Sequence, residues 1–220
     1  MTGAAEAAPT LTGAAVHWDA VWDRIDPDAA SWAQPSAERS VASVLGCLAG
    51  AGADRATAVV VDVGGGASPL AGELLDAGLT DVTVVDLAAT ALARGRARLG
   101  ERGGRVTWRV ADARDLDLAG RVTVWHDRAV LHFLSSPADT ELYTQQASRA
   151  IAPGGHAVIS GFAPDGPERC SGLPVVRRSP EDIARLMGAG WSLLEQRTEL
   201  HLTPGGNPQA FAYALLRREF

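Results

Sequence analysis

The stretch Val59–Ser68 reads VVVDVGGGAS. Its apolar, β-branched start predicts a buried parallel strand, and the glycines behind Asp62 predict a tight turn. A helix is expected next, from about Pro69 to Ala77, because proline suits a first helical turn and Gly78 suits a helix end. Glycines in such a turn permit positive φ and leave the backbone bare. The stretch therefore predicts a strand, a turn and a helix against which a cofactor can lie.

The dinucleotide-binding fingerprint G-x-G-x-x-G also joins a strand to a helix. Counted from Gly64, the position of its third glycine is taken by Pro69, which argues against a pyrophosphate site. A shorter pattern fits better: an acidic residue, one apolar residue and G-x-G. In this pattern the chain resembles the class I S-adenosylmethionine-dependent methyltransferases. The resemblance implies a methyl-donor site that contains Asp62, Gly64, Gly65 and Gly66.

A second short β-branched run, Val82–Val85, ends in an acidic residue. Asp86 follows Gly64 by 22 residues. An acidic side chain at the tip of the second strand can accept hydrogen bonds from both ribose hydroxyls of an adenosine. We therefore expect Asp86, together with Leu87, to bind the donor. The alternative is a solvated carboxylate at the end of a strand.

A third strand is expected over Arg105–Val110, after a helix that spans Leu87–Leu99 and ends in glycines. Asp112 and Ala113 follow this strand, and the family resemblance places there an acid that binds the adenine amino group. Asp112 could equally cap the turn that contains Arg114. Because ligands of open α/β sheets gather at the carboxyl ends of the strands, the adenine role is favoured.

Composition limits what else the chain contains. Its 220 residues, 46% hydrophobic, fit one sizeable domain, and a formal charge of −6 argues against an extensive nucleic-acid surface. Cys47 and Cys170 lie far apart without a C-x-x-C pair, so neither a zinc site nor a disulfide framework is predicted. No apolar run is long enough for a membrane span. A cytoplasmic enzyme without a metal is the expectation.

The expected domain organisation is a flexible N-terminus over 1–15 and one methyltransferase domain over 16–220. Within the domain, 16–52 is an N-terminal helical lid, 53–162 the cofactor-binding core, and 163–220 an acceptor loop with a C-terminal β-hairpin. A helix from His17 to Ile25 presents an apolar stripe with Trp18 and Trp22 that fits core packing.

The segment W-D-x-x-W…S-W-x-Q resembles the opening of a bacterial subgroup of these methyltransferases, where it covers the donor site. On that resemblance, Trp32 and Gln34 are pocket candidates. Trp32 could instead pack a helix onto the sheet.

The fourth strand, expected over Val122–Trp125, is followed by His126 and Asp127. It resembles the fourth motif of the family, whose strand end faces the sulfonium and the acceptor. Since the pKa of histidine lies near operating pH, His126 and Asp127 are the candidate general bases. The alternative is a turn with a solvent-facing ion pair to Arg128. His132 is expected to be a core histidine.

The C-terminal half completes the predicted fold. A fifth strand is expected over His156–Phe162, behind a Pro-Gly-Gly that resembles the family's fifth-strand signature. The connection 163–179 is predicted to lack regular structure and to line an acceptor pocket with Phe162 and Cys170. A helix over Glu181–Met187 precedes two strands, Trp191–Leu202 and Ala210–Leu216, that must pair antiparallel. The fold class is thus α/β, a Rossmann-like three-layer sandwich whose seven-stranded sheet has the order 3-2-1-4-5-7-6 with strand 7 antiparallel.

The resemblance implies transfer of a methyl group from S-adenosyl-L-methionine to N, O or S of a small-molecule acceptor by in-line displacement, leaving S-adenosyl-L-homocysteine. A protein-lysine methyltransferase is the closest alternative. A nicotinamide-dependent oxidoreductase and a non-catalytic cofactor-binding regulator are more distant ones.

Overall fold

A twisted seven-stranded sheet forms the centre of the computed structural model, which describes residues 11–220. In spatial order the strands are β3 (Thr107–Val110), β2 (Asp81–Asp86), β1 (Val59–Val63), β4 (Val122–Arg128), β5 (Ile151–Phe162), β9 (Pro208–Arg218) and β8 (Trp191–Leu202). β9 runs antiparallel to both of its neighbours, whereas the pairs among β1 to β5 are parallel. Counted along the chain within this sheet, the order is the predicted 3-2-1-4-5-7-6.

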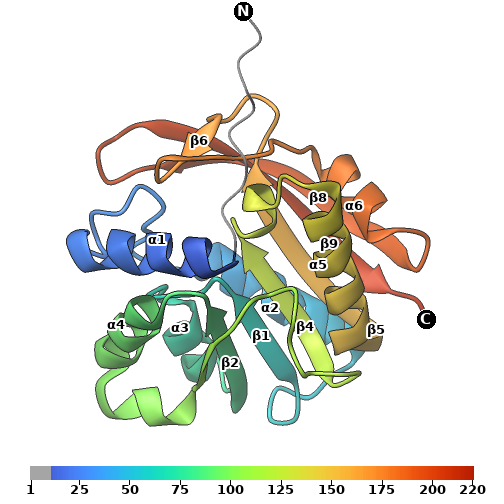
Figure 1. The fold of residues 1–220 in the computed structure, drawn as a ribbon. Coiled ribbons are helices and arrows are strands. Elements are labelled where there is room, and N and C mark those ends of the chain that lie inside the picture. Colours follow the sequence, from blue (N-terminus) through green and yellow to red (C-terminus); the bar gives the residue numbers. More distant parts are fainter. Residues whose placement is uncertain (1–10) are drawn as a thin grey trace, which may run out of the picture.

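Helices cover both faces of the sheet (Figure 1). They are α1 (Leu11–Arg24), α2 (Glu38–Ala51), α3 (Leu70–Asp76), α4 (Ala89–Leu99), α5 (Pro137–Ala150) and α6 (Pro180–Met187), with 3-10 turns η1 (Gly100–Arg105) and η2 (Leu131–Phe133). Side chains of α2, α3 and α4 pack with Val60, Val84 and Val124 into one core cluster. Side chains of α5 and α6 pack with Val61 and Trp125 into another. Alternate residues of each central strand therefore enter opposite cores, as expected for a parallel sheet buried on both faces.

The register brings the carboxyl ends of four strands to one edge. Val63 pairs with Val85 on one side and with Asp127 on the other, and Asp86 pairs with Val110. The turn after β1, the tip of β2 and the end of β4 consequently lie side by side. Helix α1 contacts α4, and it crosses this edge of the sheet (Figure 1).

Several boundaries differ from the sequence prediction. Helix α1 begins at Leu11 instead of His17, so 11–15, an alanine-containing stretch, is helical and not a flexible lead-in; residues 1–10 of that predicted segment lie outside the described residues. The connection 163–179 contains a small antiparallel pair, β6 (Arg169–Cys170) and β7 (Leu173–Pro174). β5 begins at Ile151 instead of His156, so Pro153–Gly155 lies in its irregular first part.

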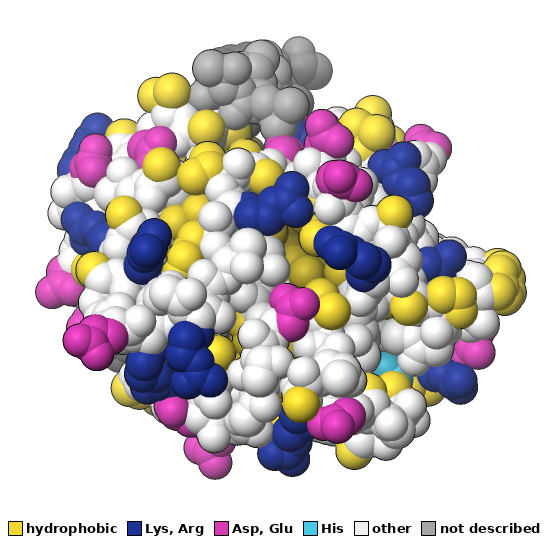
Figure 2. Space-filling model, turned by 90° about the horizontal axis from the view of Figure 1, so that it is seen from below, with side chains coloured by type: hydrophobic (Ala, Val, Ile, Leu, Met, Phe, Trp, Pro, Cys, Tyr) yellow, Lys and Arg dark blue, Asp and Glu magenta, His cyan; other side chains and the backbone are white. Residues whose placement is uncertain are grey.

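Among the described residues, the face drawn in Figure 2 has no extended patch of one charge sign. Acidic and basic side chains of the described residues are interspersed there, with apolar groups between them. Among residues 11–220, no helix combines the length and the hydrophobicity that a membrane crossing demands.

Candidate functional site

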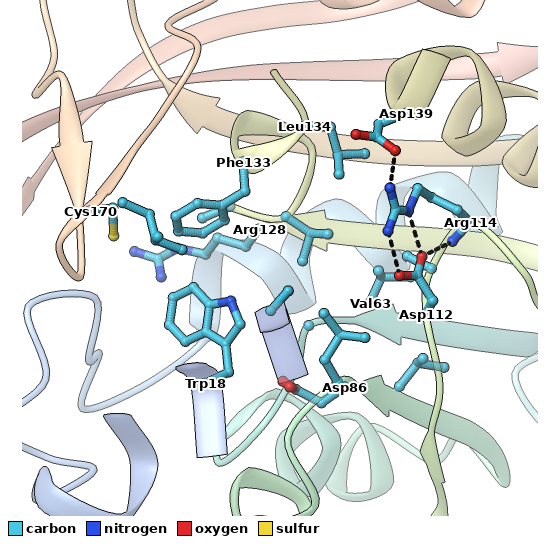
Figure 3. Close-up of a pocket in the computed structure, with 18 of the residues that line it drawn as sticks. Trp18, Val63, Asp86, Asp112, Arg114, Arg128, Phe133, Leu134, Asp139 and Cys170 are labelled. Carbon is cyan, nitrogen blue, oxygen red and sulfur yellow. Dashed lines mark hydrogen bonds and ion pairs between the residues drawn. The ribbon is translucent and has the colours of Figure 1, made fainter. Parts of the chain in front are cut away.

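A cavity, here called the main cavity, opens at the carboxyl edge of the sheet. From the tips of β1, β2 and β3 it is lined by Gly64, Asp86, Leu87, Asp112, Ala113 and Arg114. From α1, the end of β4 and the β6–β7 pair it is lined by Trp18, Arg128, Phe133, Cys170 and Pro174. Figure 3 shows Asp86 and Asp112 on one side of this space, and Trp18, Phe133 and Arg128 on another. Five of the eight predicted donor residues thus share one cavity with a set of aromatic residues; Asp62 and Gly65 line a second cavity, and Gly66 lines neither.

The glycine turn needs glycine for steric reasons that the structure makes explicit. Gly64 has φ +65, and a Cβ atom there would lie 2.2 Å from Cγ2 of Val130. A Cβ atom on Gly65 would lie 2.2 Å from Oδ2 of Asp62. Gly66, with φ +45, passes close to Trp22 and to Oδ2 of Asp86. The backbone therefore folds tightly here: a side chain at Gly65 or Gly66 would crowd the carboxylates of Asp62 and Asp86, and one at Gly64 would clash with Val130.

Asp62 supports the turn from beneath. The residue is 3% exposed, and its Oδ1 lies 2.8 Å from Nδ1 of His126. The other ring nitrogen of His126, Nε2, lies 3.0 Å from Oγ of Ser40 on α2. Both Asp62 and His126 line a second cavity, which adjoins the main one and also contains Gly65 and Gln34. The Asp62–His126–Ser40 chain of hydrogen bonds therefore joins β1, β4 and α2 behind the glycine turn.

Asp86 is the acidic group at the wall of the main cavity. Its Oδ1 accepts a hydrogen bond of 2.9 Å from the backbone N–H of Ala88. Burial raises the pKa of Asp86 to about 7, and the nearby carboxylates of Asp62 and Asp19 act in the same direction. A half-buried carboxylate of this kind stabilises a ligand that brings hydroxyl donors to it.

Asp112 lines the main cavity, but its carboxylate is already occupied by Arg114. Oδ1 accepts from the backbone N–H of Arg114 at 2.7 Å and from its Nε at 2.9 Å, and Oδ2 accepts from Nη2 at 2.9 Å. Arg114 also pairs with Asp139 of α5 (Figure 3). The turn-capping role that the sequence leaves open for Asp112 is therefore present in the structure. An adenine amino group would share this carboxylate with Arg114.

The two candidate general bases do not face the main cavity. Asp127 is 0% exposed, and its carboxylate accepts hydrogen bonds from the backbone N–H groups of Val130 (2.7 Å) and Leu131 (3.0 Å) and from the hydroxyl of Tyr143 (2.5 Å). Burial raises its pKa to about 6, against these hydrogen bonds. Asp127 thus caps η2 from inside the fold. His126, 2% exposed, is held between Asp62 and Ser40.

Asp127 lines neither cavity, so its position does not fit the predicted general-base role. His126 lines only the second cavity, where both of its ring nitrogens are hydrogen-bonded, and its catalytic role stays a prediction. The predicted alternative, a solvent-facing ion pair with Arg128, is not formed either. His132, expected in the core, is buried, and burial and then Arg178 and Arg128 lower its pKa to about 3.

The four predicted substrate residues separate in the structure. Trp32 lines both cavities and lies edge-on to Trp18 and Trp22, with ring centroids 6.0 and 5.7 Å away. Cys170 lines the main cavity, and Gln34 lines the second. Phe162 is a correction: it lines neither cavity and packs against Phe211, because it belongs to the side of β5 that faces the core.

Several residues of the main cavity, among them Trp18, Arg128 and Phe133, are not predicted as site residues by the sequence patterns. The apolar helix stripe assigns Trp18 to core packing, although its ring contacts Phe133 at 5.1 Å over the cavity. Arg128 is expected only as an ion-pair partner, because the predicted fourth strand stops at Trp125. A usable signal exists for Phe133, since it follows the fourth strand within the segment that resembles the family's acceptor-facing motif.

Comparison with known proteins agrees with this geometry. Residues 60–155 match the family model described as a methyltransferase domain. No curated protein matches the chain.

Similar solved structures cover nearly the whole chain. One is 1,6-didemethyltoxoflavin-N1-methyltransferase of Burkholderia thailandensis, solved with its substrate and S-adenosylhomocysteine (24% identity, 100% of this chain and 94% of that one, TM-score 0.70). Another comes from echinomycin biosynthesis, where a disulfide bond is converted into a thioacetal group (22% identity, 94% and 92%, TM-score 0.71). A third is the cyclase SpnF (14% identity, 97% and 98%, TM-score 0.70).

These likenesses establish the fold, and the family model covers the segment from β1 into β5 that carries the glycine turn and the acidic strand tips. Residues 60–155 therefore resemble a methyltransferase domain, and the chain has the Rossmann-like fold of these solved structures.

Proposed function

We propose that this protein transfers the methyl group of S-adenosylmethionine to a small-molecule acceptor. The observation that carries the proposal is the continuity of the main cavity, which extends from Asp86 and Gly64 to an aromatic region formed by Trp18, Trp32 and Phe133. Donor and acceptor would meet within one cavity. The neighbour from B. thailandensis, which was solved with a small-molecule substrate, is consistent with this class of acceptor.

Donor binding is assigned to the strand tips. The carboxylate of Asp86 would accept hydrogen bonds from the ribose hydroxyls, because it is a half-buried acceptor that opens onto the cavity. Leu87, Asp112 and Ala113 would flank the adenine, and the bare backbone of Gly64 and Gly65 would border the methionine portion in the second cavity. When bound, the donor supplies a methyl group activated by its sulfonium.

The protein's own contribution would be alignment and exclusion of water. Trp18, Trp32 and Phe133 form apolar walls where the acceptor would lie, and edge-to-face contacts between Trp18 and the other two rings fix them relative to each other. Holding a nucleophile in line with the methyl group contributes much of the rate in reactions of this type. His126 and Asp127 would act by holding the glycine turn and η2 in place.

A protein lysine is the competing acceptor. A lysine side chain must enter a site from a docked surface, whereas residues of α1 and of the β6–β7 pair line this aromatic region. Methyl transfer itself must also be tested, because the cyclase SpnF has the same fold.

The test combines binding and product measurements. Calorimetry should show that S-adenosylhomocysteine binds and that NAD and NADP do not; a preference for a nicotinamide would overturn the donor assignment. With radiolabelled donor and a cell extract, label should enter the small-molecule fraction, and heat-denatured enzyme serves as the control. Label only in protein would favour the lysine alternative, and donor binding without any transfer would indicate a regulator.

A further inference from the structure

The most unusual side chain of the main cavity is Arg128, the last residue of β4. It lies where the main and second cavities adjoin and lines both of them. In Figure 3 its guanidinium lies between Phe133, Trp18 and Cys170. The residue therefore occupies the part of the cavity that the proposed function assigns to the acceptor, and its proposed role rests on that function.

Two contacts fix the plane of the guanidinium. Nη1 donates a hydrogen bond of 3.0 Å to the backbone carbonyl of Trp32, and the central carbon lies 4.8 Å from the ring centroid of Phe211. These contacts come from the α1–α2 connection and from β9. The orientation of the group is therefore set before any ligand arrives, which lowers the entropy cost of binding one.

The remaining edge of the guanidinium is not satisfied. Nε and Nη2 are both buried, and neither has a hydrogen-bond partner among the described residues. In a planar guanidinium these two nitrogens share one edge and present parallel N–H groups, the geometry that matches the two oxygens of a carboxylate. Within 11–220, Arg128 forms no ion pair with any carboxylate. A buried cation without an anion is costly, so a ligand anion would be strongly favoured there.

The surroundings are electropositive although the whole chain has a formal charge of −6. Burial, and after it the charge of Arg128, lower the pKa values of His132 and His201. Burial raises the pKa of the Cys170 thiol, and the charge of Arg128 opposes that rise. Arg178 also lowers the pKa of His132. No described acidic side chain forms an ion pair with Arg128 at this end of the cavity. An acidic ligand would therefore be attracted most strongly here.

We propose that the Nε–Nη2 edge of Arg128 binds the carboxylate of the acceptor, which is a flat, aromatic carboxylic acid. The guanidinium selects the acid through two parallel hydrogen bonds. Trp18 and Phe133, whose rings meet at 5.1 Å with planes 75° apart, provide apolar faces for the ring. Arg128 is thus a specificity-determining residue for the methyl acceptor.

The test uses matched ligand pairs with S-adenosylhomocysteine at saturation. Benzoate, 2-aminobenzoate and indole-3-acetate are compared by calorimetry with their primary amides. At least one acid is expected to bind, and its amide about tenfold or more weakly, because a neutral amide cannot satisfy two donors. Equal affinity for an acid and its amide, or no binding by any acid, would overturn the proposal.

Variants separate the possible roles of Arg128. Arg128→Gln should weaken acid binding by about tenfold or more, and Arg128→Lys should recover only part of it, because ammonium is a point charge without the two-donor edge. Arg185→Gln, which alters an exposed arginine paired with Asp182 on α6, is the control and should match the wild type. Unchanged acid affinity in Arg128→Gln would contradict the inference.

Two further readouts distinguish acceptor binding by Arg128 from donor binding and from a structural role. If Arg128→Gln weakens S-adenosylhomocysteine about tenfold instead, Arg128 binds the donor's own carboxylate and the proposal is wrong. The melting temperature without ligands should not fall in Arg128→Gln, since the variant removes an unpaired buried charge; a large fall would indicate a structural arginine. Failure of S-adenosylhomocysteine to bind the wild type would reject the proposed function itself, independently of Arg128.

Discussion

Asp86 lines the main cavity and has a raised pKa, so its protonation should affect stability and donor binding as the pH changes. Its folded-state pKa, raised to about 7 by burial, lies above the ordinary value of 3.8. Between these values the folded protein holds a proton that the unfolded chain has lost. The contribution of Asp86 to stability without ligand therefore decreases as pH rises through this window. The ionised carboxylate at the cavity wall therefore lowers the stability of the ligand-free protein.

Ribose hydroxyls that donate to Asp86 favour its ionised form, so donor binding should lower its pKa. We predict that the dissociation constant of S-adenosylhomocysteine at about pH 6 is roughly five- to tenfold higher than at about pH 8. Compared with the wild type, Asp86→Asn should bind S-adenosylhomocysteine more weakly at about pH 8, and its affinity should be the same at the two pH values. Calorimetry measures both, and equal wild-type affinity at the two pH values would show that Asp86 does not contact the donor.

Without ligand, Asp86→Asn should melt at a higher temperature than the wild type at about pH 8, because the variant removes the half-buried charge while the amide oxygen can still accept from Ala88. The difference should shrink toward about pH 5. A higher melting temperature in Asp86→Asn indicates a carboxylate that serves ligand binding, whereas a lower one would indicate a carboxylate that stabilises the fold.

At the scale of elements, the end of β4 is organised around Asp127. Its carboxylate receives the N–H groups of Val130 and Leu131 at the start of η2 and the hydroxyl of Tyr143 from α5. Tyr143 in turn accepts a hydrogen bond from Nε1 of Trp125. One buried carboxylate therefore joins a strand, a 3-10 turn and a helix, and it places Phe133 at the cavity.

Asp127→Ala leaves three buried donors without an acceptor and should lower the free energy of unfolding by about 2–4 kcal/mol. Urea unfolding measures the loss, and the exposed Asp117→Ala, which should change stability little, is the control. Because Asp127 does not line the main cavity, turnover per folded molecule in Asp127→Asn should fall less than about tenfold. Normal stability with abolished turnover would restore the general-base interpretation.

At the scale of the whole molecule, the sheet is predictable from the sequence because its strands are short β-branched runs that end in glycine or acidic residues. The same pattern locates Gly64, Asp86 and Asp112 at one edge, where the register and the cavity place them. These features are local in sequence, and the parallel topology brings them together without help from distant side chains.

Other parts of the site depend on long-range contacts that no local pattern encodes. His126 is held by Ser40 and Asp62, and Arg128 is oriented by Trp32 and Phe211. Histidine and aspartate at a strand end predict catalysis, but in the structure the Asp127 carboxylate is hydrogen-bonded inside the fold, and both ring nitrogens of His126 have partners. Phe162 lines neither cavity because it packs with Cys170 and Phe211, a contact between distant segments that no local pattern encodes.

The central claim is that one adenosyl group lies across the carboxyl ends of β1 and β2. A crystal structure with S-adenosylhomocysteine tests it most directly. We predict ribose hydroxyls within hydrogen-bonding distance of the Asp86 carboxylate, and the homocysteine portion against the backbone of Gly64. A nucleoside bound away from both residues would contradict the claim.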